Sequence, residues 1–178
     1  DVGGGFGEKA PLFPEEVLIP HLAIVLGRLI KWVENRQENM TSFHGRGHSV
    51  EMQASVRSDG TTLGITVNIV ADLGAYCFLS TPTVPVLTSH RLTGPYRTPA
   101  MSVVVQGVVT NKPPTGAYRG AGGPGAAFCM ERTMDLIAQD LDLDPAEVRR
   151  RDLSAPDAFP YETPTGIAYD SGEYEAAF

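Results

Sequence analysis

The sequence has little cysteine, no excess of positive charge and no long apolar run, and each shortage argues against a class of protein. Cys77 and Cys129 lack the CxxC spacing of zinc or iron–sulfur sites, so we expect two buried free thiols. The formal net charge of -7 leaves no basic field for nucleic acid. The longest apolar run, residues 17–26, is far shorter than the roughly 20 residues of a membrane-spanning helix.

Glycine is abundant instead, and it gathers in two loops. The first covers residues 3–9 (GGGFGEK), and the second covers residues 117–125 (AYRGAGGPG). Glycine lets the main chain approach a ligand closely, and the exposed N–H groups then donate to anionic groups. A single glycine-rich loop is more often a tight connection. Two such loops together indicate a backbone-lined anion site.

Neither loop has both the residues and the surroundings of a nucleotide-binding motif. Residues 3–9 lack the Gly-Lys-Ser/Thr ending of a phosphate-binding loop. Residues 120–125 match GxGxxG, but that fingerprint needs a strand leading directly into the glycines and a parallel strand after the helix. Here residues 111–116 intervene, and a second helix follows at Asp144. The sequence therefore disfavours a nicotinamide- or flavin-binding unit.

Apolar periodicity predicts an α+β fold. We expect a helix over residues 15–26, ending at Gly27, and a short buried strand over residues 29–33. Alternating residues over 48–56 and 63–69 predict two strands joined by a hairpin at Asp59-Gly60, with positive φ at both turn residues. Residues 101–110 predict a further strand, after a partly ordered connection over 81–99.

Two helices should follow the second loop. Pro124 suits the first turn of a helix whose core-facing stripe would be Ala126, Met130, Met134, Ile137 and Leu141. Asp144 and Glu147 predict a second helix that begins with a capping box. The expected architecture is a mixed or antiparallel sheet packed against helices. Both ends of the sequence look cut, so we expect residues 1–178 to be a single truncated segment of a larger domain.

The two loops, and the residues between them, resemble the molybdopterin-binding region of molybdenum hydroxylase large subunits. This is the family of xanthine dehydrogenase, aldehyde oxidase and the carbon monoxide dehydrogenase large chain. Beyond the loops, the resemblance includes residues 31–40 (KWVENRQENM), 44–46 (HGR), 72–76 (DLGAY) and 110–112 (TNK). It covers nearly the whole chain. It implies a molybdenum cofactor-binding domain-like fold and a molybdenum-molybdopterin cofactor, in the cytosine dinucleotide form if the organism is bacterial.

The resemblance also implies roles for individual residues. In the family, two loop amides lie against the molybdenum, and they correspond to the backbone amides of Phe6 and Arg119. Close approach of the cofactor would be permitted by Gly4, Gly5, Gly7 and Gly120. The general base of the family is a glutamate from a later segment, so we assign no catalytic residue to this chain.

Four positions depart from the family pattern. Ala10 and Gln106 stand where purine hydroxylases carry a glutamate and an arginine, and Ala121 stands where many members have a substrate-stacking phenylalanine. Gly120 replaces the copper-carrying cysteine of carbon monoxide dehydrogenases. A site built to hydrogen-bond its substrate discriminates strongly through such groups. These differences disfavour purines and copper-dependent carbon monoxide oxidation.

The implied activity is hydroxylation of an aldehyde or N-heterocycle carbon with oxygen derived from water. Electrons would pass to iron–sulfur clusters and FAD on partner domains or subunits. The expected partners are those subunits, the rest of the large subunit and a small-molecule substrate, in the cytoplasm. The isolated segment would be inactive. The alternative is a non-catalytic structural or interaction module that keeps the loops without the cofactor.

Overall fold

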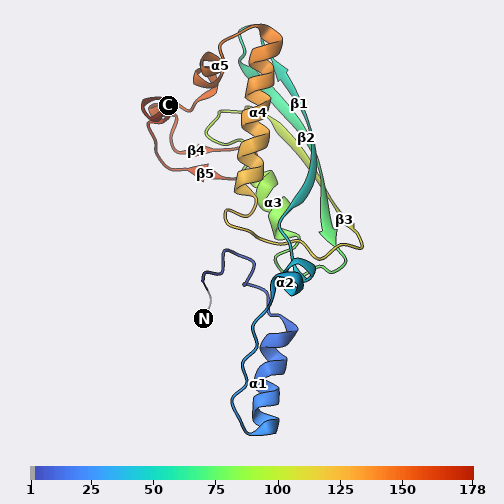
Figure 1. Cartoon of the computed structure of the whole chain (residues 1–178). Helices are drawn as coiled ribbons and strands as arrows, with labels where there is room; N and C mark the ends of the chain where they lie inside the picture. Colours follow the sequence, from blue (N-terminus) through green and yellow to red (C-terminus); the bar gives the residue numbers. More distant parts are fainter. Residues whose placement is uncertain (1–2) are drawn as a thin grey trace.

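The computed structural model describes residues 3–178, and it confirms a mixed sheet packed against helices (Figure 1). The sheet has the strand order β1 (Gly47–Val56), β2 (Thr62–Gly74) and β3 (Met101–Val109). β1 and β2 are antiparallel, whereas β2 and β3 are parallel. The long helix α4 (Gly123–Leu141) covers one face of this sheet.

The core lies between α4 and the sheet. The predicted stripe of α4 is confirmed, because Ala126, Met130, Met134 and Ile137 are buried and Leu141 packs against them. The facing side chains come from alternating strand positions and include Ile65, Val67 and Ile69 of β2. Full burial of each such side chain contributes about 1.5–3 kcal/mol, so this interface holds the sheet and α4 together.

The hairpin between β1 and β2 is confirmed, but its predicted turn geometry is wrong at one residue. Gly60 has a φ of 93°, whereas Asp59 stays outside the positive-φ region. The N–H of Gly60 donates to Arg57 O at 2.9 Å, and the Asp59 carboxylate accepts from Thr61 N–H at 3.0 Å. A turn followed by one left-handed glycine also joins twisted strands, so a single positive φ suffices.

Short elements complete the fold. α2 (Arg36–Ser42) precedes β1, and α3 (Thr83–His90) lies in the proline-rich connection. After α4 come α5 (Pro145–Asp152), the 3-10 helix η1 (Pro156–Ala158), the hairpin of β4 (Tyr161–Glu162) and β5 (Ala168–Tyr169), and α6 (Tyr174–Ala177). Asp144 caps α5 by accepting from Ala146 N–H at 2.7 Å. The predicted capping box is wrong, because Glu147 pairs with Arg150 at 2.6 Å.

The N-terminal helix α1 (Pro14–Leu26) projects from the sheet as an arm (Figure 1). It ends at Gly27, which has a φ of 60° as the sequence predicts for a left-handed cap. The strand predicted over residues 29–33 is wrong, because this segment joins no strand ladder and Leu29 is fully exposed. Residues 3–178 contain no helix that is both long and apolar enough to cross a membrane.

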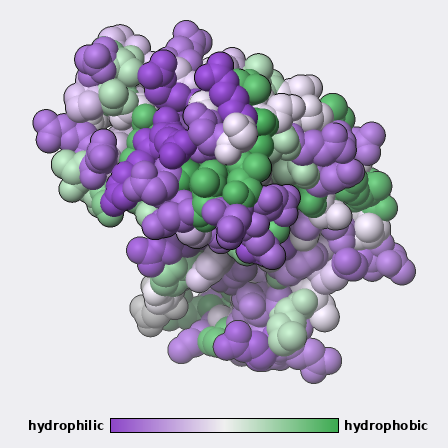
Figure 2. Space-filling view, turned by 90° about the horizontal axis from the view of Figure 1, so that it is seen from above, coloured by the Kyte–Doolittle hydropathy of each residue, from purple (hydrophilic) through white to green (hydrophobic). Residues whose placement is uncertain are grey.

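The surface of the sheet end farthest from the arm is mainly hydrophilic, with apolar side chains gathered in its centre (Figure 2).

The two cysteines are free, but they are not both buried as the sequence predicts. Cys77 is exposed and Cys129 is partly buried. Burial raises the pKa of the Cys129 thiol.

Candidate functional site

The two glycine-rich loops lie against each other, although they are far apart in the sequence. The contact is made by Gly7, which has a φ of 101°, and the backbone of Ala117. A Cβ atom at residue 7 would collide with the carbonyl oxygen of Ala117. Only glycine meets both conditions, because other residues resist this φ and would lack the space. The contact therefore brings the two predicted loops to one place.

The backbone of both loops is unusual. Positive φ occurs at Gly4, Phe6 and Gly7 in the first loop, and at Gly120 and Ala121 in the second. Within residues 3–178, Phe6 and Ala121 are two of the three non-glycine residues with positive φ. A non-glycine residue in this region costs of order 1–3 kcal/mol, and such strain clusters at functional sites.

The loops present backbone N–H groups that have no acceptor within the described part of the chain. In the first loop these include the amides of Gly4, Gly5 and Phe6, and in the second loop those of Arg119 and Gly120. All five residues are exposed. Neighbouring amides that point out of a turn form an anion-binding concavity. The arrangement can therefore accept an anionic group without any side-chain ligand.

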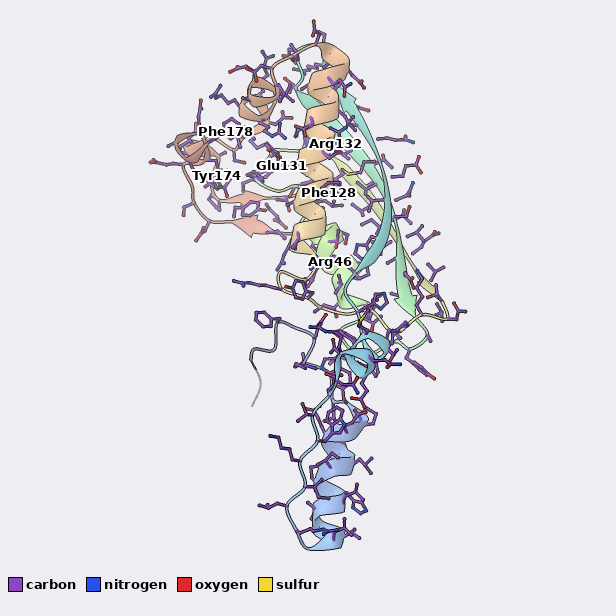
Figure 3. All side chains as sticks on the ribbon, viewed as in Figure 1. Arg46, Phe128, Glu131, Arg132, Tyr174 and Phe178 are labelled. Atoms are coloured by element: carbon purple, nitrogen blue, oxygen red, sulfur yellow. The ribbon has the colours of Figure 1, made fainter. Side chains whose placement is uncertain are left out.

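Two arginines hold the carbonyl groups of the second loop. Arg46 Nη2 donates to Tyr118 O at 3.1 Å and to Arg119 O at 3.4 Å, and Arg91 Nη1 donates to Gly120 O at 3.3 Å. Figure 3 shows Arg46 at the foot of β1, close to the end of α4 where the loop enters the helix. A trans peptide directs its C=O and N–H in opposite directions. Arg46 thus turns the N–H groups of Arg119 and Gly120 away from itself.

Asp72 fixes the chain that leads into the second loop. Its carboxylate accepts from Lys112 Nζ at 2.7 Å, from Thr110 Oγ1 at 2.6 Å and from Gly74 N–H at 2.9 Å. The hydrogen bond from Lys112, followed by those from Thr110 and Gly74, holds the Asp72 pKa well below its usual range. The charged carboxylate is therefore stabilised where β2 and β3 end.

The stretch before β1 runs beside the base of the second loop. Gly116 N–H donates to His44 O, and His44 N–H donates to Pro114 O, each at 3.1 Å. The Phe43 ring occupies the space that a side chain at Gly116 would need. Two side-chain nitrogens here, His44 Nδ1 and Arg46 Nε, are buried and have no partner among the described residues.

An ion pair anchors the first loop. Lys9 Nζ lies 2.7 Å from Glu34 Oε2, and Glu34 also accepts from Asn39 Nδ2 at 3.1 Å. The hydrogen bond from Lys9 is the largest cause that lowers the pKa of Glu34. Within the loop, Lys9 N–H donates to Gly5 O at 3.2 Å. The loop is thus held from its C-terminal side, and Phe6 remains about half exposed (52%).

The predicted pocket residues do not all come together. Ala10 follows the first loop and is exposed, and Ala121 lies within the second loop and is partly buried. Gln106 lies on β3 opposite Val70, on the exposed sheet face that is turned away from α4. No hydrogen bond within residues 3–178 joins Gln106 to either loop. Arg46 and Arg91, in contrast, contact the second loop although the sequence assigned them no role.

Metal-ligand side chains do not gather at this site. Within residues 3–178, no three His, Cys, Asp or Glu side chains are placed to hold a metal ion. Burial, followed by the charge of Arg46, lowers the pKa of His48. The donors that the loops offer are therefore backbone amides and cationic side chains, which suit an anionic group better than a bare cation.

Comparison with known proteins points to one family. The model of the molybdopterin cofactor-binding domain matches residues 1–153. The carbon monoxide dehydrogenase large chain of Hydrogenophaga pseudoflava is 41% identical over 99% of this chain, and the nicotine 6-hydroxylase large subunit of Paenarthrobacter nicotinovorans is 35% identical over 98%. This chain spans only 22% of the length of either relative.

A solved structure agrees with this match. Quinoline 2-oxidoreductase from Pseudomonas putida 86 superposes with a TM-score of 0.91 at 37% identity. The match covers 98% of this chain and 22% of that one. The fold seen here therefore recurs, with its loops and its arm, as a portion of much longer chains.

Proposed function

Because this chain belongs to the molybdopterin cofactor-binding domain family of molybdenum-dependent oxidoreductases, we propose that its two glycine-rich loops form part of the cofactor site of a hydroxylase. The observation that carries the proposal is the contact between Gly7 and Ala117. This contact brings two sets of free N–H donors into one site. A pterin phosphate and oxo ligands are anionic groups that such donors recognise.

The residues present fit a molybdenum-molybdopterin group. In the proposal, the backbone amides of Phe6 and Arg119 would face the bound group, and Gly4, Gly5, Gly7 and Gly120 would permit its close approach. Arg46 and Arg91 keep the second loop's carbonyl oxygens away from the anion. When bound, the group supplies oxidation of an electron-poor carbon with oxygen derived from water. This chain orients the group and contributes positive potential, while the proton-accepting glutamate comes from another part of the subunit.

The proposed substrate is an aldehyde or an N-heterocycle. Ala10 and Ala121 place only methyl groups at their positions, and Gln106, which carries no positive charge, lies on the sheet face turned away from α4. A purine would therefore lose the charged partners that recognise it in purine hydroxylases. Gly120 has no side chain and cannot hold copper, which disfavours carbon monoxide as substrate. Two relatives, by their names, act on the heterocycles nicotine and quinoline.

The proposal extends to the rest of the protein. We place residues 1–178 within a longer large subunit that works in the cytoplasm with iron–sulfur and FAD subunits or domains. The cofactor would be the cytosine dinucleotide form in a bacterium. The coverage of only 22% of the relatives' length supports the larger subunit.

A substrate panel in ¹⁸O-labelled water tests the proposed reaction. The full-length subunit, purified with its partners, would be given quinoline, benzaldehyde, xanthine or carbon monoxide with a dye as electron acceptor. We expect kcat/KM for quinoline or benzaldehyde to exceed that for xanthine by about tenfold or more, as expected where buried polar partners are missing. The hydroxylated product of quinoline should carry ¹⁸O, because quinoline has no oxygen that could exchange with water beforehand. A preference for xanthine or carbon monoxide, or oxygen taken from O₂, would contradict the proposal.

A further inference from the structure

The arm, which we define as residues 12–33, exposes apolar side chains on several sides. It consists of α1 and the segment that runs back along it (Figure 1). No residue of α1 is buried, and Ile24 and Leu29 are 80% and 100% exposed. The other exposed apolar side chains are Leu12, Val17, Leu18, Val25, Leu26, Trp32 and Val33. Between Glu16 and Arg28 the sequence contains no Asp, Glu, Lys or Arg.

This pattern differs from that of a surface helix. A helix on the surface of a globular protein carries one apolar stripe and one polar face. At about 100° per residue, Val17, Val25 and Leu26 point in three well-separated directions around the α1 axis. A helix that is apolar all round is a buried helix. Within residues 3–178, nothing buries it.

The returning segment has unpaired backbone groups. Residues 29–33 (LIKWV) have the composition of a strand, yet their backbone makes no hydrogen bond within the described part of the chain. A groove of about 480 Å³ separates this segment from α1. Its apolar lining includes Ile19, Pro20 and Ile30. Both the backbone and the groove can therefore accept further protein.

We infer that the arm is enclosed by the remaining part of the same large subunit, with residues 29–33 pairing as a strand there. The inference rests on the proposed function, which places the chain in a longer subunit. The match to quinoline 2-oxidoreductase covers 98% of this chain, so the arm recurs within a chain that extends well beyond the matched 22%. The strand predicted from the sequence is thus unpaired here because its partner strand lies outside these residues.

The shape of the arm favours the same polypeptide over a second copy or a partner subunit. A two-fold contact between copies buries one self-complementary patch on each. The arm is apolar on several sides and therefore needs enclosure from several directions. Permanent interfaces resemble a domain core cut in half, and the arm has the composition of such a core. A covalently linked remainder supplies this enclosure at any protein concentration.

Hydrogen exchange on the full-length subunit tests the inference. The subunit would be measured alone and with its partner subunits, each at two concentrations about a hundredfold apart. We expect the amides of residues 29–33 to exchange at least about 100-fold more slowly than in an unfolded chain, in every sample. Protection that disappears on dilution would assign the arm to a second copy. Protection that requires the partner subunits, or no protection at all, would also overturn the inference.

A pair of substitutions supplies a matched control. Ile24→Asp places a charge on the arm, whereas Ile24→Leu keeps its apolar character. In the full-length subunit, Ile24→Asp should raise the rate of proteolysis within residues 12–33 by about tenfold or more, and Ile24→Leu should leave it unchanged. Equal rates would count against enclosure. Molybdenum content, measured on the same samples, separates the enclosed arm from the proposed cofactor site. A protected arm in a subunit without molybdenum would contradict only the proposed function.

Discussion

The carbonyl oxygen of Ala117 occupies the position that a side chain at Gly7 would need. This relationship fixes how the two loops meet, because it allows no side chain larger than hydrogen at residue 7. The positive φ of Gly7 adds a second requirement for glycine. One residue thus controls the distance between two sets of amide donors that belong to different parts of the chain.

Substitution of Gly7 should separate the loops. Gly7→Ala would incur about 1–3 kcal/mol of backbone strain in addition to the collision with Ala117. We expect the full-length subunit carrying Gly7→Ala to bind the cofactor at least about tenfold more weakly than wild type, since 1.4 kcal/mol corresponds to tenfold, and therefore to contain less molybdenum. Gly3→Ala is the control, because a Cβ atom at residue 3 would meet no neighbouring atom among residues 3–178. Metal analysis that finds equal molybdenum in both variants would refute the role of the contact.

Arg46 should position the second loop without contacting the substrate. Arg46→Met removes both hydrogen bonds to the loop carbonyls, and Arg46→Lys keeps the charge but loses the planar fork. In the full-length enzyme we expect kcat to fall by about tenfold or more in Arg46→Met and less in Arg46→Lys, with KM nearly unchanged.

A spectroscopic readout separates positioning from a general loss of stability. The electron paramagnetic resonance signal of Mo(V) should change shape in Arg46→Met, because the amides beside the metal would move. Arg132→Met is the control, since Arg132 is exposed and its nearest acidic partner lies 3.9 Å away. A lower melting temperature with an unchanged signal would show that Arg46 only stabilises the fold.

Relief of backbone strain at Ala121 should stabilise the chain. Ala121 has a φ of 46°, which glycine adopts without penalty. We expect Ala121→Gly to change the free energy of unfolding by about +0.5 to +1 kcal/mol, since the relieved strain exceeds the added entropy of the unfolded chain. Ala121→Val should instead destabilise it, because a β-branched residue tolerates this φ poorly. Urea unfolding of the three proteins would check the order, and a destabilised glycine variant would contradict it.

Acid should weaken the segment that Asp72 anchors. The folded-state pKa of Asp72 lies below its unfolded value, mainly because Lys112 donates to the carboxylate. Its contribution to stability is therefore complete above an ordinary Asp pKa of about 4 and is lost as the pH falls below that value. Asp72→Asn removes this contribution. Urea unfolding should show the largest gap between wild type and variant above about pH 5, and a gap that shrinks toward pH 2. A constant gap would show that ionisation is irrelevant.

The sequence predicts elements whose signals are local. The apolar stripe of α4 and the Asp59-Gly60 hairpin are confirmed because helical spacing, strand alternation and turn residues act within a few positions. The strand over residues 29–33 is wrong within this chain because a strand needs a partner, and the sequence of one segment does not supply it. The capping box at Glu147 is wrong for a different reason, because Arg150, three residues along the same helix, pairs with the Glu147 carboxylate.

The sequence predicts the two loops of the candidate site, but not the side chains that hold them. Both loops are visible in the sequence, and the structure brings them into contact through Gly7. The sequence does not reveal the roles of Arg46 and Arg91, because each donates to backbone carbonyls of a distant loop. Every residue has a backbone carbonyl, so the residue types do not show which one is the acceptor. The exposure of Cys77 was missed for a similar reason, since a lone cysteine shows no periodicity.

Metal and pterin analysis would show whether the two loops hold molybdopterin. The full-length subunit would be purified with its partners from a host that makes the cofactor, beside its Gly7→Ala and Gly3→Ala variants. We expect near-stoichiometric molybdenum and pterin in the wild type and in Gly3→Ala, with a large loss in Gly7→Ala. A well-folded, fully assembled wild-type subunit without molybdenum or pterin would contradict this expectation.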